Sequence, residues 1–493
     1  MKTFFARLFA KAIHRKNQKW VANPHEAQQK TLHFLLKTAQ NTQFGKDHNF
    51  KKIDTYQDFK AQVPVRNYEG IRPYVERILQ GEKDILWPGQ PLYLAKTSGT
   101  TSGAKFIPIT KASMPTHITA ARDALLNYIH ETGNTDFVTG KQIFLQGSPI
   151  LEKKKGIAFG RLSGIVAHYV PSYLQTNRMP SWETNCIEDW ETKVSAIVEE
   201  TVSEKMTLIA GIPSWVQMYF ERLKQREKKS VGEIFPHFSL FVYGGVNYKP
   251  YRALFEKLIG RKVDSVELFP ASEGFFAYQD RQKEEGLLLL LNNDIFYEFI
   301  EADTFFSDSP VRICLEEVEL GVNYVLILNT SAGLWGYNIG DTVQFVSKAP
   351  YRLIVSGRIK HFISAFGEHV IGKEVESALQ EAMAGTKASV REFTVAPQIA
   401  PKEGLPYHEW LIDFNVLPEN PLAFASALDR AMRNQNIYYD DLIRGNVLQP
   451  AVVTHVTEGA FEAYMKSIGK LGGQNKVPRL TNDRSIADQL VKY

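Results

Sequence analysis

The sequence predicts an α/β protein with a large N-terminal domain and a smaller α+β C-terminal domain. Two observations predict the large domain: short apolar runs alternate with helical periodicity over residues 141–270, and further apolar runs follow at short intervals over residues 295–357. A third observation predicts the C-terminal domain: a compact α+β pattern begins after Gly357. With 493 residues and 44% hydrophobic side chains, the chain can form large cores, which excludes disorder, collagen and small disulfide scaffolds.

The first third of the chain is predicted to be rich in helices. Residues 22–41 carry apolar side chains at near-helical spacing, and Gly45 supplies a stop. Residues 1–20 combine phenylalanine and leucine with lysine and arginine, which is typical of an amphipathic helix with a basic face. A membrane-surface anchor or a transit peptide is one interpretation. A helix that packs on its own domain is favoured, because the apolar core and cleavage site of a signal peptide are missing.

The middle of the chain is predicted to form a largely parallel sheet, because strands that alternate with helices imply right-handed crossovers. The predicted strands are residues 141–148, 206–213, 239–245 and 263–270, and the predicted helices are residues 189–204, 214–226 and 249–260. Four later runs predict an antiparallel meander or a small barrel; they are residues 295–301, 323–330, 342–348 and 351–357.

The N-terminal domain is predicted to cover residues 1–357 and the C-terminal domain residues 361–493, with a hinge at residues 358–360. In the second domain, strands are expected at REFTVAP, EWLIDFNV and AVVTHVT, and helices near residues 421–433 and 459–468.

Charge and cysteine content narrow the possible functions. With 58 Lys and Arg against 54 Asp and Glu, the net charge of +4 does not predict a nucleic-acid partner. Cys186 and Cys314 have no metal-ligand spacing, so neither a disulfide framework nor a zinc site is indicated, and a reducing, cytoplasmic location is expected. No apolar run approaches the roughly 18 residues of a membrane span, so stable membrane insertion is not expected.

The most informative stretch is YLAKTSGTTSGAKFIPIT, residues 93–110. Small residues let backbone N–H groups approach an anion, hydroxyls add donors, and Lys105 brings positive charge, so the stretch is typical of a phosphate-binding loop. Gly99 and Gly103 do not have Walker A spacing, which disfavours a P-loop NTPase. A polar surface turn is the alternative interpretation.

Three further segments carry candidate ligand groups. Glu273 follows a predicted strand directly, where its carboxylate could hold Mg²⁺ on a nucleotide phosphate. Asp341 follows a glycine at a strand start and could accept from both hydroxyls of a ribose. Arg358 and Lys360 lie at the predicted domain junction. Each also has a simpler interpretation, as a helix N-terminal charge, a turn residue or a surface cation.

Other catalytic chemistry has little support. GTTSG is not a G-x-S-x-G nucleophile elbow, and the chain lacks an HExxH motif. His361, His369 and His408 are expected to be structural or solvent-facing.

The order of these motifs resembles that of the adenylate-forming enzymes, which include acyl-CoA synthetases, luciferases and peptide-synthetase adenylation domains. The chain is most similar to the Gretchen Hagen type of auxin-responsive acyl acid–amido synthetases, in a bacterial-looking form. The resemblance rests on LWPGQPLYLAKTSGTTSGAKFIP, FPASE, YNIGD and GGQNKVPRL, and it spans from about residue 42 to the C-terminal tail.

The resemblance implies a role for each matching position. ATP phosphates would lie along Ser98, Thr100, Thr101 and Lys105, and the adenine would lie between Gly244, Gly245 and Phe269. Glu273 would bind Mg²⁺, Asp341 the ribose, and Arg358 the ribose or phosphate side. Lys360 would lie at the hinge, and Lys476 would reach the acid's carboxylate and the α-phosphate. Further ATP-site positions are Gly99, Ser272 and Tyr337.

Chemistry gives an independent reason for Lys476. Attack of a carboxylate on the α-phosphorus joins two anions, so the transition state needs cations such as a lysine and Mg²⁺.

Two positions depart from the family pattern: Phe269 replaces a tyrosine and loses its hydroxyl, and Asn338 replaces an arginine and removes a cation near the ribose site.

The sequence therefore predicts an ATP-dependent ligase that adenylates a small carboxylic acid and transfers the acyl group to an amino acid, releasing AMP. Transfer to coenzyme A or a carrier thiol is one alternative, and a non-catalytic nucleotide-binding protein is another. Phe275, Phe276 and Tyr278 could line an acyl pocket, but core positions are favoured for them.

Overall fold

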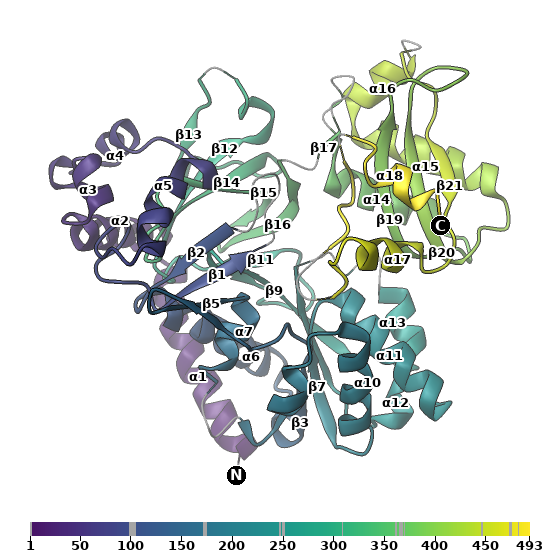
Figure 1. The fold of residues 1–493 in the computed structure, drawn as a ribbon, viewed down its shortest axis with the longest axis horizontal. Coiled ribbons are helices and arrows are strands. Elements are labelled where there is room, and N and C mark those ends of the chain that lie inside the picture. The colour runs from purple at the N-terminus through teal and green to yellow at the C-terminus, as the bar shows by residue number, and fades with distance from the viewer. Residues whose placement is uncertain are drawn as a thin grey trace. The chain divides into compact units, whose positions relative to one another are not determined.

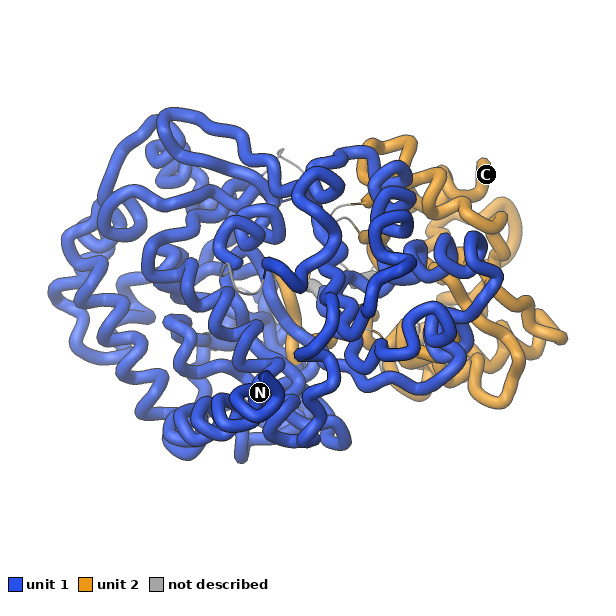
Figure 2. The backbone as a smooth tube through the Cα atoms, turned by 90° about the horizontal axis from the view of Figure 1, so that it is seen from below, with its two compact units in different colours: residues 1–247, 255–339, 344–354 blue, residues 248–254, 340–343, 355–493 orange. Residues whose placement is uncertain are grey.

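The chain divides into two compact units (Figure 2). Unit 1 comprises residues 1–247, 255–339 and 344–354, and unit 2 comprises residues 248–254, 340–343 and 355–493. The hinge predicted at residues 358–360 concerns motion and stays a prediction. The computed structural model describes residues 2–97, 105–170, 175–245, 248, 252–307, 309–359, 362–363, 368, 370–444, 447–472, 476–481 and 483–493.

Helices dominate the first part of unit 1, as predicted (Figure 1). Their bounds are α1 Lys2–Val21, α2 Pro24–Ala39, α3 Gln43–Asp47, α4 Tyr56–Gln62 and α5 Tyr68–Leu79. Hydrogen-bonding side chains cap several of them: Thr55 and Asp58 form a capping box at the start of α4, and Asn67 caps α5. At Gly45 a Cβ atom would come within 2.3 Å of the Ala39 carbonyl oxygen, so the chain can fold back there only with glycine.

A twelve-stranded sheet forms the centre of the fold. Its strand order is β13-β12-β14-β15-β16-β11-β10-β9-β8-β7-β3-β6. The bounds are β3 Lys141–Phe144, β6 Arg178–Met179, β7 Met206–Ala210, β8 Leu240–Gly244, β9 Asp264–Ala271, β10 Gly274–Tyr278, β11 Leu287–Leu289, β12 Ile295–Glu301, β13 Arg312–Ile313, β14 Asn323–Thr330, β15 Tyr337–Lys348 and β16 Tyr351–Arg358.

One end of this sheet is parallel, as predicted. Strands β6, β3, β7, β8 and β9 pair in parallel, and helices connect them in sequence. The helices of this region are α6 Ser113–Thr132, α7 Leu162–Ala167, α9 Trp182–Asn185, α10 Trp190–Thr201, α11 Pro213–Glu227, α12 Val231–Ile234 and α13 Arg252–Ile259. Short 3₁₀ turns occur at Phe50–Lys52, Asp136–Thr139, Ala302–Thr304 and Leu315–Glu317.

The second half of the sheet contains the runs predicted to form a meander or a small barrel. They are the neighbouring strands β12, β14, β15 and β16, and they continue the same sheet. Strands β10 and β11 join the two halves: β10 pairs with β9 in an antiparallel hairpin, and β11 pairs with both β10 and β16. All five residues of β10 are buried, so Phe275, Phe276 and Tyr278 are core residues, as favoured.

A smaller four-stranded sheet has the order β2-β1-β5-β4. Its strands are β1 Tyr93–Thr97, β2 Lys105–Ile109, β4 Glu152–Lys154 and β5 Ile157–Gly160. Strands β1 and β2 are antiparallel, with Thr97 opposite Lys105. Residues on both sides of the predicted phosphate loop are therefore held by strand pairing.

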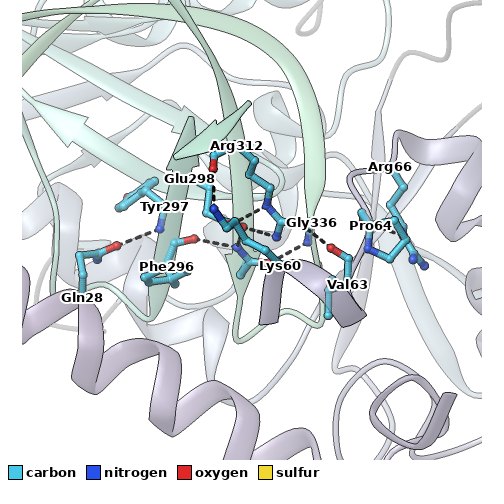
Figure 3. A network of polar contacts seen from close by, with 11 residues as sticks. Gln28, Lys60, Val63, Pro64, Arg66, Phe296, Tyr297, Glu298, Arg312 and Gly336 are labelled. Carbon is cyan, nitrogen blue, oxygen red and sulfur yellow. Dashed lines mark hydrogen bonds and ion pairs between the residues drawn. The ribbon is translucent and has the colours of Figure 1, made fainter. Parts of the chain in front are cut away.

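A buried polar network ties the N-terminal helices to the sheet (Figure 3). The Arg312 guanidinium pairs with the Glu298 carboxylate, and their side chains are 8% and 0% exposed. Asn329 donates to the same carboxylate at 2.7 Å, and Arg312 also donates to the Val63 carbonyl after α4. Gln28 of α2 donates to the Ile295 carbonyl at 2.9 Å and accepts from the Tyr297 amide at 2.8 Å. These contacts fix where the helices cross β12 to β14.

Unit 2 contains a three-stranded sheet covered on both faces by helices. Trp410 and Ile412 point to the side that packs against α14 and α15, whereas Leu411, between them, points to the side of α17 and α18. The strands of this sheet are β19 Ser389–Gln398, β20 Tyr407–Val416 and β21 Val452–His455, and β17 Phe362–Ile363 and β18 Val370–Ile371 form a two-stranded sheet of their own. The helices are α14 Gly372–Met383, α15 Pro421–Gln435, α16 Ile437–Arg444, α17 Ala460–Ser467 and α18 Ala487–Leu490. The predicted α+β pattern is confirmed.

Within the described residues, none of the helices has both the length and the apolar character needed to cross a bilayer. Cys186 and Cys314 are both free thiols. His408 is 1% exposed and its Nε2 lies 2.8 Å from a Glu368 carboxylate oxygen, which confirms a structural role; His361 and His369 lie outside the described residues.

Candidate functional site

Ser272 and Glu273 form the two-residue turn between β9 and β10, where Ala271 pairs with Gly274. Ser272 is 8% exposed, whereas Glu273 is half-buried. At Gly274 a Cβ atom would come within 2.6 Å of the Ile295 side chain, so glycine lets the hairpin pack closely against β12. The Glu273 carboxylate thus lies at the carboxyl end of a parallel strand, where open α/β sheets bind their ligands.

Gly244 ends the neighbouring strand β8, opposite Leu268 of β9. A Cβ atom at Gly244 would come within 2.5 Å of the Leu268 carbonyl oxygen, so strand packing itself requires glycine. Gly245 follows with a φ of +85°, which lets the chain leave the sheet at this edge. The carboxyl ends of β8 and β9 therefore bring Gly244, Gly245, Ser272 and Glu273 to the same edge of the sheet.

Phe269 lies in β9, three residues before Ser272. Its side chain is 8% exposed, and its ring packs edge to face against Phe276 at a centroid distance of 5.0 Å. The aromatic contact holds the ring in place within unit 1. Contact of this ring with adenine stays a prediction.

Lys105 begins β2, directly after the predicted phosphate loop. Its ammonium nitrogen lies 5.8 Å from the centroid of the Tyr68 ring in α5, and the Tyr68 hydroxyl accepts from the Phe106 amide at 2.9 Å. A cation–π contact on a buried tyrosine anchors the lysine next to the loop. Ser98, Gly99, Thr100 and Thr101 lie outside the described residues, so their predicted phosphate contacts stay predictions.

Tyr337 begins β15 and is 1% exposed. The Arg66 amide donates to the Gly336 carbonyl at 2.8 Å, and the Asn338 amide donates to the Arg66 carbonyl at 2.8 Å, so the strand start is tied to the segment after α4. Gly336 has a φ of +55°, and a Cβ atom there would come within 2.5 Å of the Pro64 carbonyl oxygen. Tyr337 is thus a core position, and its predicted contact with the nucleotide is untested.

Asp341 and Arg358 lie on the neighbouring strands β15 and β16, in the parts of these strands that are assigned to unit 2. The Ile359 amide donates to the Gly340 carbonyl at 2.7 Å, which brings the backbone on either side of these two residues together. Gly340 has a φ of +87°, and Asp341 is half-buried. Nothing is described of the Arg358 side chain, and Lys360 lies outside the described residues. The strand geometry agrees with a shared site for positions 341 and 358.

Lys476 is exposed and precedes a segment that is fixed to β19. The Val395 amide donates to the Arg479 carbonyl at 2.9 Å, and the Thr481 amide donates back to the Val395 carbonyl at 2.9 Å. Arg479 forms ion pairs with Glu376 at 3.3 Å and with Glu392. Lys476 therefore lies three residues before a strongly anchored point.

Lys193 is a buried cation that sequence reasoning missed. It is 1% exposed and donates to the carbonyls of Gln146 at 3.0 Å and Asn185 at 2.7 Å. Burial lowers the pKa of Lys193 to about 8, the nearby thiol of Cys186 opposes the shift, and the positive charge of Arg161 adds to it. The available signal was its place on the apolar face of α10, at helical spacing with Trp190, Val194 and Ile197.

The predicted site residues divide between the two units. Unit 1 holds the described positions Lys105, Gly244, Gly245, Phe269, Ser272, Glu273 and Tyr337, and unit 2 holds Asp341, Arg358 and Lys476. Among the described residues, no group of three or more His, Cys, Asp or Glu side chains could hold a metal ion. A single carboxylate such as Glu273 fits Mg²⁺ nonetheless, because Mg²⁺ usually takes one or two carboxylates together with substrate phosphates.

Three models of one family match the chain in order: the GH3 family N-terminal domain at residues 14–185, the central domain at residues 288–358 and the C-terminal domain at residues 373–485. The chain belongs to the GH3 family. This confirms the family that the motifs predicted. The matches cover most of both units, and the central-domain match ends at Arg358.

Curated relatives of this GH3 chain extend over nearly its full length. A jasmonoyl–L-amino acid synthetase GH3.5 of Oryza sativa subsp. japonica is 23% identical and covers 92% of each chain. An indole-3-acetic acid-amido synthetase GH3.3 of Arabidopsis thaliana is 21% identical over 94% of this chain and 90% of its own.

Solved structures share the fold of this GH3 chain. A GH3.15 acyl acid amido synthetase superposes with a TM-score of 0.79 at 16% identity, covering 96% of this chain and 95% of its own. A 2-hydroxyisobutyryl-CoA ligase superposes with a TM-score of 0.63 at 14% identity, covering 96% of this chain and 93% of its own. The chain thus shares its fold with an acyl acid amido synthetase and with a CoA ligase.

Proposed function

We propose that this GH3 chain is an ATP-dependent acyl acid–amido synthetase. It adenylates a small carboxylic acid with release of pyrophosphate, and then transfers the acyl group to an amino acid with release of AMP. The observation that carries the proposal is the ordered match of all three GH3 domains, together with full-length relatives that are named as amido or amino acid synthetases.

The first half-reaction joins two anions. A carboxylate oxygen of the acid attacks the α-phosphorus, and the bond from that phosphorus to pyrophosphate breaks. Lys476 balances the charge that develops between the acid and the α-phosphate, and Lys105 lies along the phosphate chain. Glu273 holds Mg²⁺, which when bound offsets the charge of the phosphates and the leaving pyrophosphate.

The nucleotide is held by residues at or near the ends of strands. Gly244 and Gly245 offer backbone to the adenine without side chains in the way, and Phe269 supplies an aromatic face. Asp341 accepts from the ribose hydroxyls, with Arg358 on the ribose or phosphate side. The phosphate loop adds Ser98, Gly99, Thr100 and Thr101, and the remaining ATP-site positions are Ser272 and Tyr337.

The second half-reaction forms the amide. The amine nitrogen of the amino acid attacks the acyl carbon, the bond from that carbon to the AMP oxygen breaks, and a proton leaves the amine. A turn of the C-terminal domain at residues 358–360 exchanges the adenylation arrangement for the transfer arrangement.

The substrates are an aromatic or aliphatic carboxylic acid and a small amino acid, and nucleic acid is not a partner. We place the reaction in the cytoplasm, where ATP is available and the two free cysteines stay reduced.

The test is to incubate the protein with ATP, Mg²⁺, pooled carboxylic acids and pooled amino acids, and to identify the nucleotide product and any amide by mass spectrometry. The proposal expects AMP, pyrophosphate and an amide that requires both pools. ADP in place of AMP would overturn it. AMP formed only when coenzyme A replaces the amino acids would assign a thiol acceptor, and nucleotide binding without AMP would assign a non-catalytic role.

A further inference from the structure

Helix α1 has two different faces. Its inner face carries Ala10, Ile13, Asn17 and Trp20, which are all less than 9% exposed and follow helical spacing. This face packs against α6, and the His14 ring stacks on His130 of α6 at 3.8 Å. The helix is therefore part of unit 1, as the favoured interpretation of the sequence expected, but this packing uses only one side of it.

The outer face carries an apolar patch in the first turns of the helix, defined by Phe4, Phe5, Leu8 and Phe9. These side chains are 62%, 63%, 51% and 47% exposed. Exposed apolar residues are ordinary when scattered singly, but contiguous exposed apolar patches of this kind mark surfaces that meet a partner. Here four large apolar side chains lie within six consecutive residues of one helix.

The same helix is strongly basic. Between Lys2 and Val21 it has six Lys or Arg side chains and no Asp or Glu, and all six are exposed; they are Lys2, Arg7, Lys11, Arg15, Lys16 and Lys19. Arg122 of α6 adds a guanidinium 5.6 Å from the Phe9 ring. The two acidic side chains of α6 already have partners: Asp123 pairs with Arg122 at 2.7 Å, and Glu131 accepts from the Gln282 amide at 2.8 Å.

We propose that the outer face of α1 docks this protein on the surface of a lipid bilayer that contains anionic headgroups. The phenylalanine and leucine side chains enter the boundary between headgroups and acyl chains, and the surrounding lysines and arginines contact the phosphates. The helix lies in the plane of the interface and does not cross the membrane.

The positive charge and the apolar patch of α1 favour an anionic lipid bilayer over a second copy of this chain or a nucleic acid. A second copy meeting the same face would bring positive side chains against positive side chains, which is unfavourable without counter-charges. A nucleic acid would satisfy the cations but would leave four large apolar side chains without a matching surface. An anionic bilayer surface complements both the charge and the apolar patch, and the inference holds whether or not the proposed ligase activity is confirmed.

The test measures partitioning of the full-length protein between buffer and vesicles by co-sedimentation. Vesicles of phosphatidylcholine with phosphatidylglycerol are compared with vesicles of phosphatidylcholine alone. Binding to the anionic vesicles is expected to be about tenfold or more stronger and to weaken as salt is raised. Equal binding to both kinds of vesicle, or binding to neither, would overturn the proposal.

Two paired variants test the two parts of the face. Phe5→Ser with Phe9→Ser removes half of the apolar patch, and Lys11→Glu with Lys16→Glu reverses two charges; each pair is expected to weaken anionic-vesicle binding about tenfold or more. The thermal unfolding midpoint checks that both variants fold.

Matched controls alter the same residue types elsewhere on unit 1: Phe306→Ser, whose side chain is 65% exposed, and Lys224→Glu with Lys229→Glu at the exposed end of α11. The controls should bind vesicles as the wild type does. An equal loss in the controls would contradict the proposal, as would a dimer, seen by light scattering, that only the phenylalanine variant abolishes.

Discussion

At the scale of single residues, the proposed chemistry depends most on Lys476. It is exposed, but the residues that follow it are hydrogen-bonded to β19 and anchored by Arg479. An anchored stem limits the positions that the ammonium group can take, and a fixed cation stabilises a transition state better than a freely moving one.

Substitution Lys476→Ala tests this residue. The rate of adenylation, measured as exchange of labelled pyrophosphate into ATP, is expected to fall roughly 10²-fold or more, which is the scale of one lost electrostatic stabiliser. Lys470→Ala, an exposed lysine six positions earlier in the same unit, serves as the control and should exchange normally. A near-normal rate for Lys476→Ala would remove this lysine from the site.

Lys193 gives a prediction about pH. Because burial lowers its pKa to about 8 from an ordinary value of 10.5, the unfolded chain holds a proton that the folded chain has lost between these two values. The Lys193 contribution to the free energy of unfolding therefore rises as pH rises from about 8 to about 10.5.

The measurement is urea unfolding of the wild type and of Lys193→Met at about pH 7.5 and about pH 9.5. The free energy of unfolding of the wild type minus that of the variant should be larger at the higher pH. Lys224→Met, on the exposed surface of α11, controls for the loss of a helical lysine. A difference that does not change with pH would contradict the burial argument.

At the scale of elements, packing of the N-terminal helices on the sheet depends on the Arg312–Glu298 pair (Figure 3). Removing Arg312 would leave the Glu298 carboxylate buried without its cationic partner, although Asn329 would still donate to it. Breaking a buried pair costs more than replacing both partners by apolar side chains, because one charge is left uncompensated.

Arg312→Met is therefore expected to lower the free energy of unfolding by about 3–5 kcal/mol, measured by urea denaturation. The double variant Arg312→Met with Glu298→Leu should be more stable than Arg312→Met alone. Arg77→Met, which breaks an exposed pair with Glu82, should change stability little. If Arg312→Met lowered the free energy of unfolding as little as Arg77→Met does, packing of the N-terminal helices on the sheet would not depend on the buried pair.

At the scale of the whole molecule, the proposed reaction needs two arrangements of two units. The candidate groups for phosphate and Mg²⁺ lie in unit 1, whereas Asp341, Arg358 and Lys476 lie in unit 2. A movement about residues 358–360 would present different groups in the two half-reactions.

Lys360→Pro tests that movement, because proline restricts the backbone at its own position and at the residue before it. Pyrophosphate exchange should be retained while amide formation falls, which separates a hinge from a general loss of structure. Glu403→Pro, in the exposed loop between β19 and β20, is the control. Equal loss of both half-reactions in Lys360→Pro would contradict the hinge.

The sequence by itself determined the family and many of the helices and strands. Local patterns suffice for these, since helical periodicity marks α10, α11 and α15, short apolar runs mark β7, β8 and β20, and motifs such as FPASE and YNIGD are contiguous. It did not predict β10 or β11 as strands. For β10 the reason is that Ser272 and Glu273, which connect it to β9, are not residues typical of a two-residue hairpin turn.

Only the tertiary structure decided which residues meet across the chain. It joined the predicted meander to the parallel sheet, brought Gly244 to the same edge as Glu273, and placed Lys193 and Arg312 among buried partners. It also showed that α1 buries one face and leaves the other exposed. These outcomes depend on contacts between residues far apart in the chain, and such contacts leave no periodic signal in the local sequence.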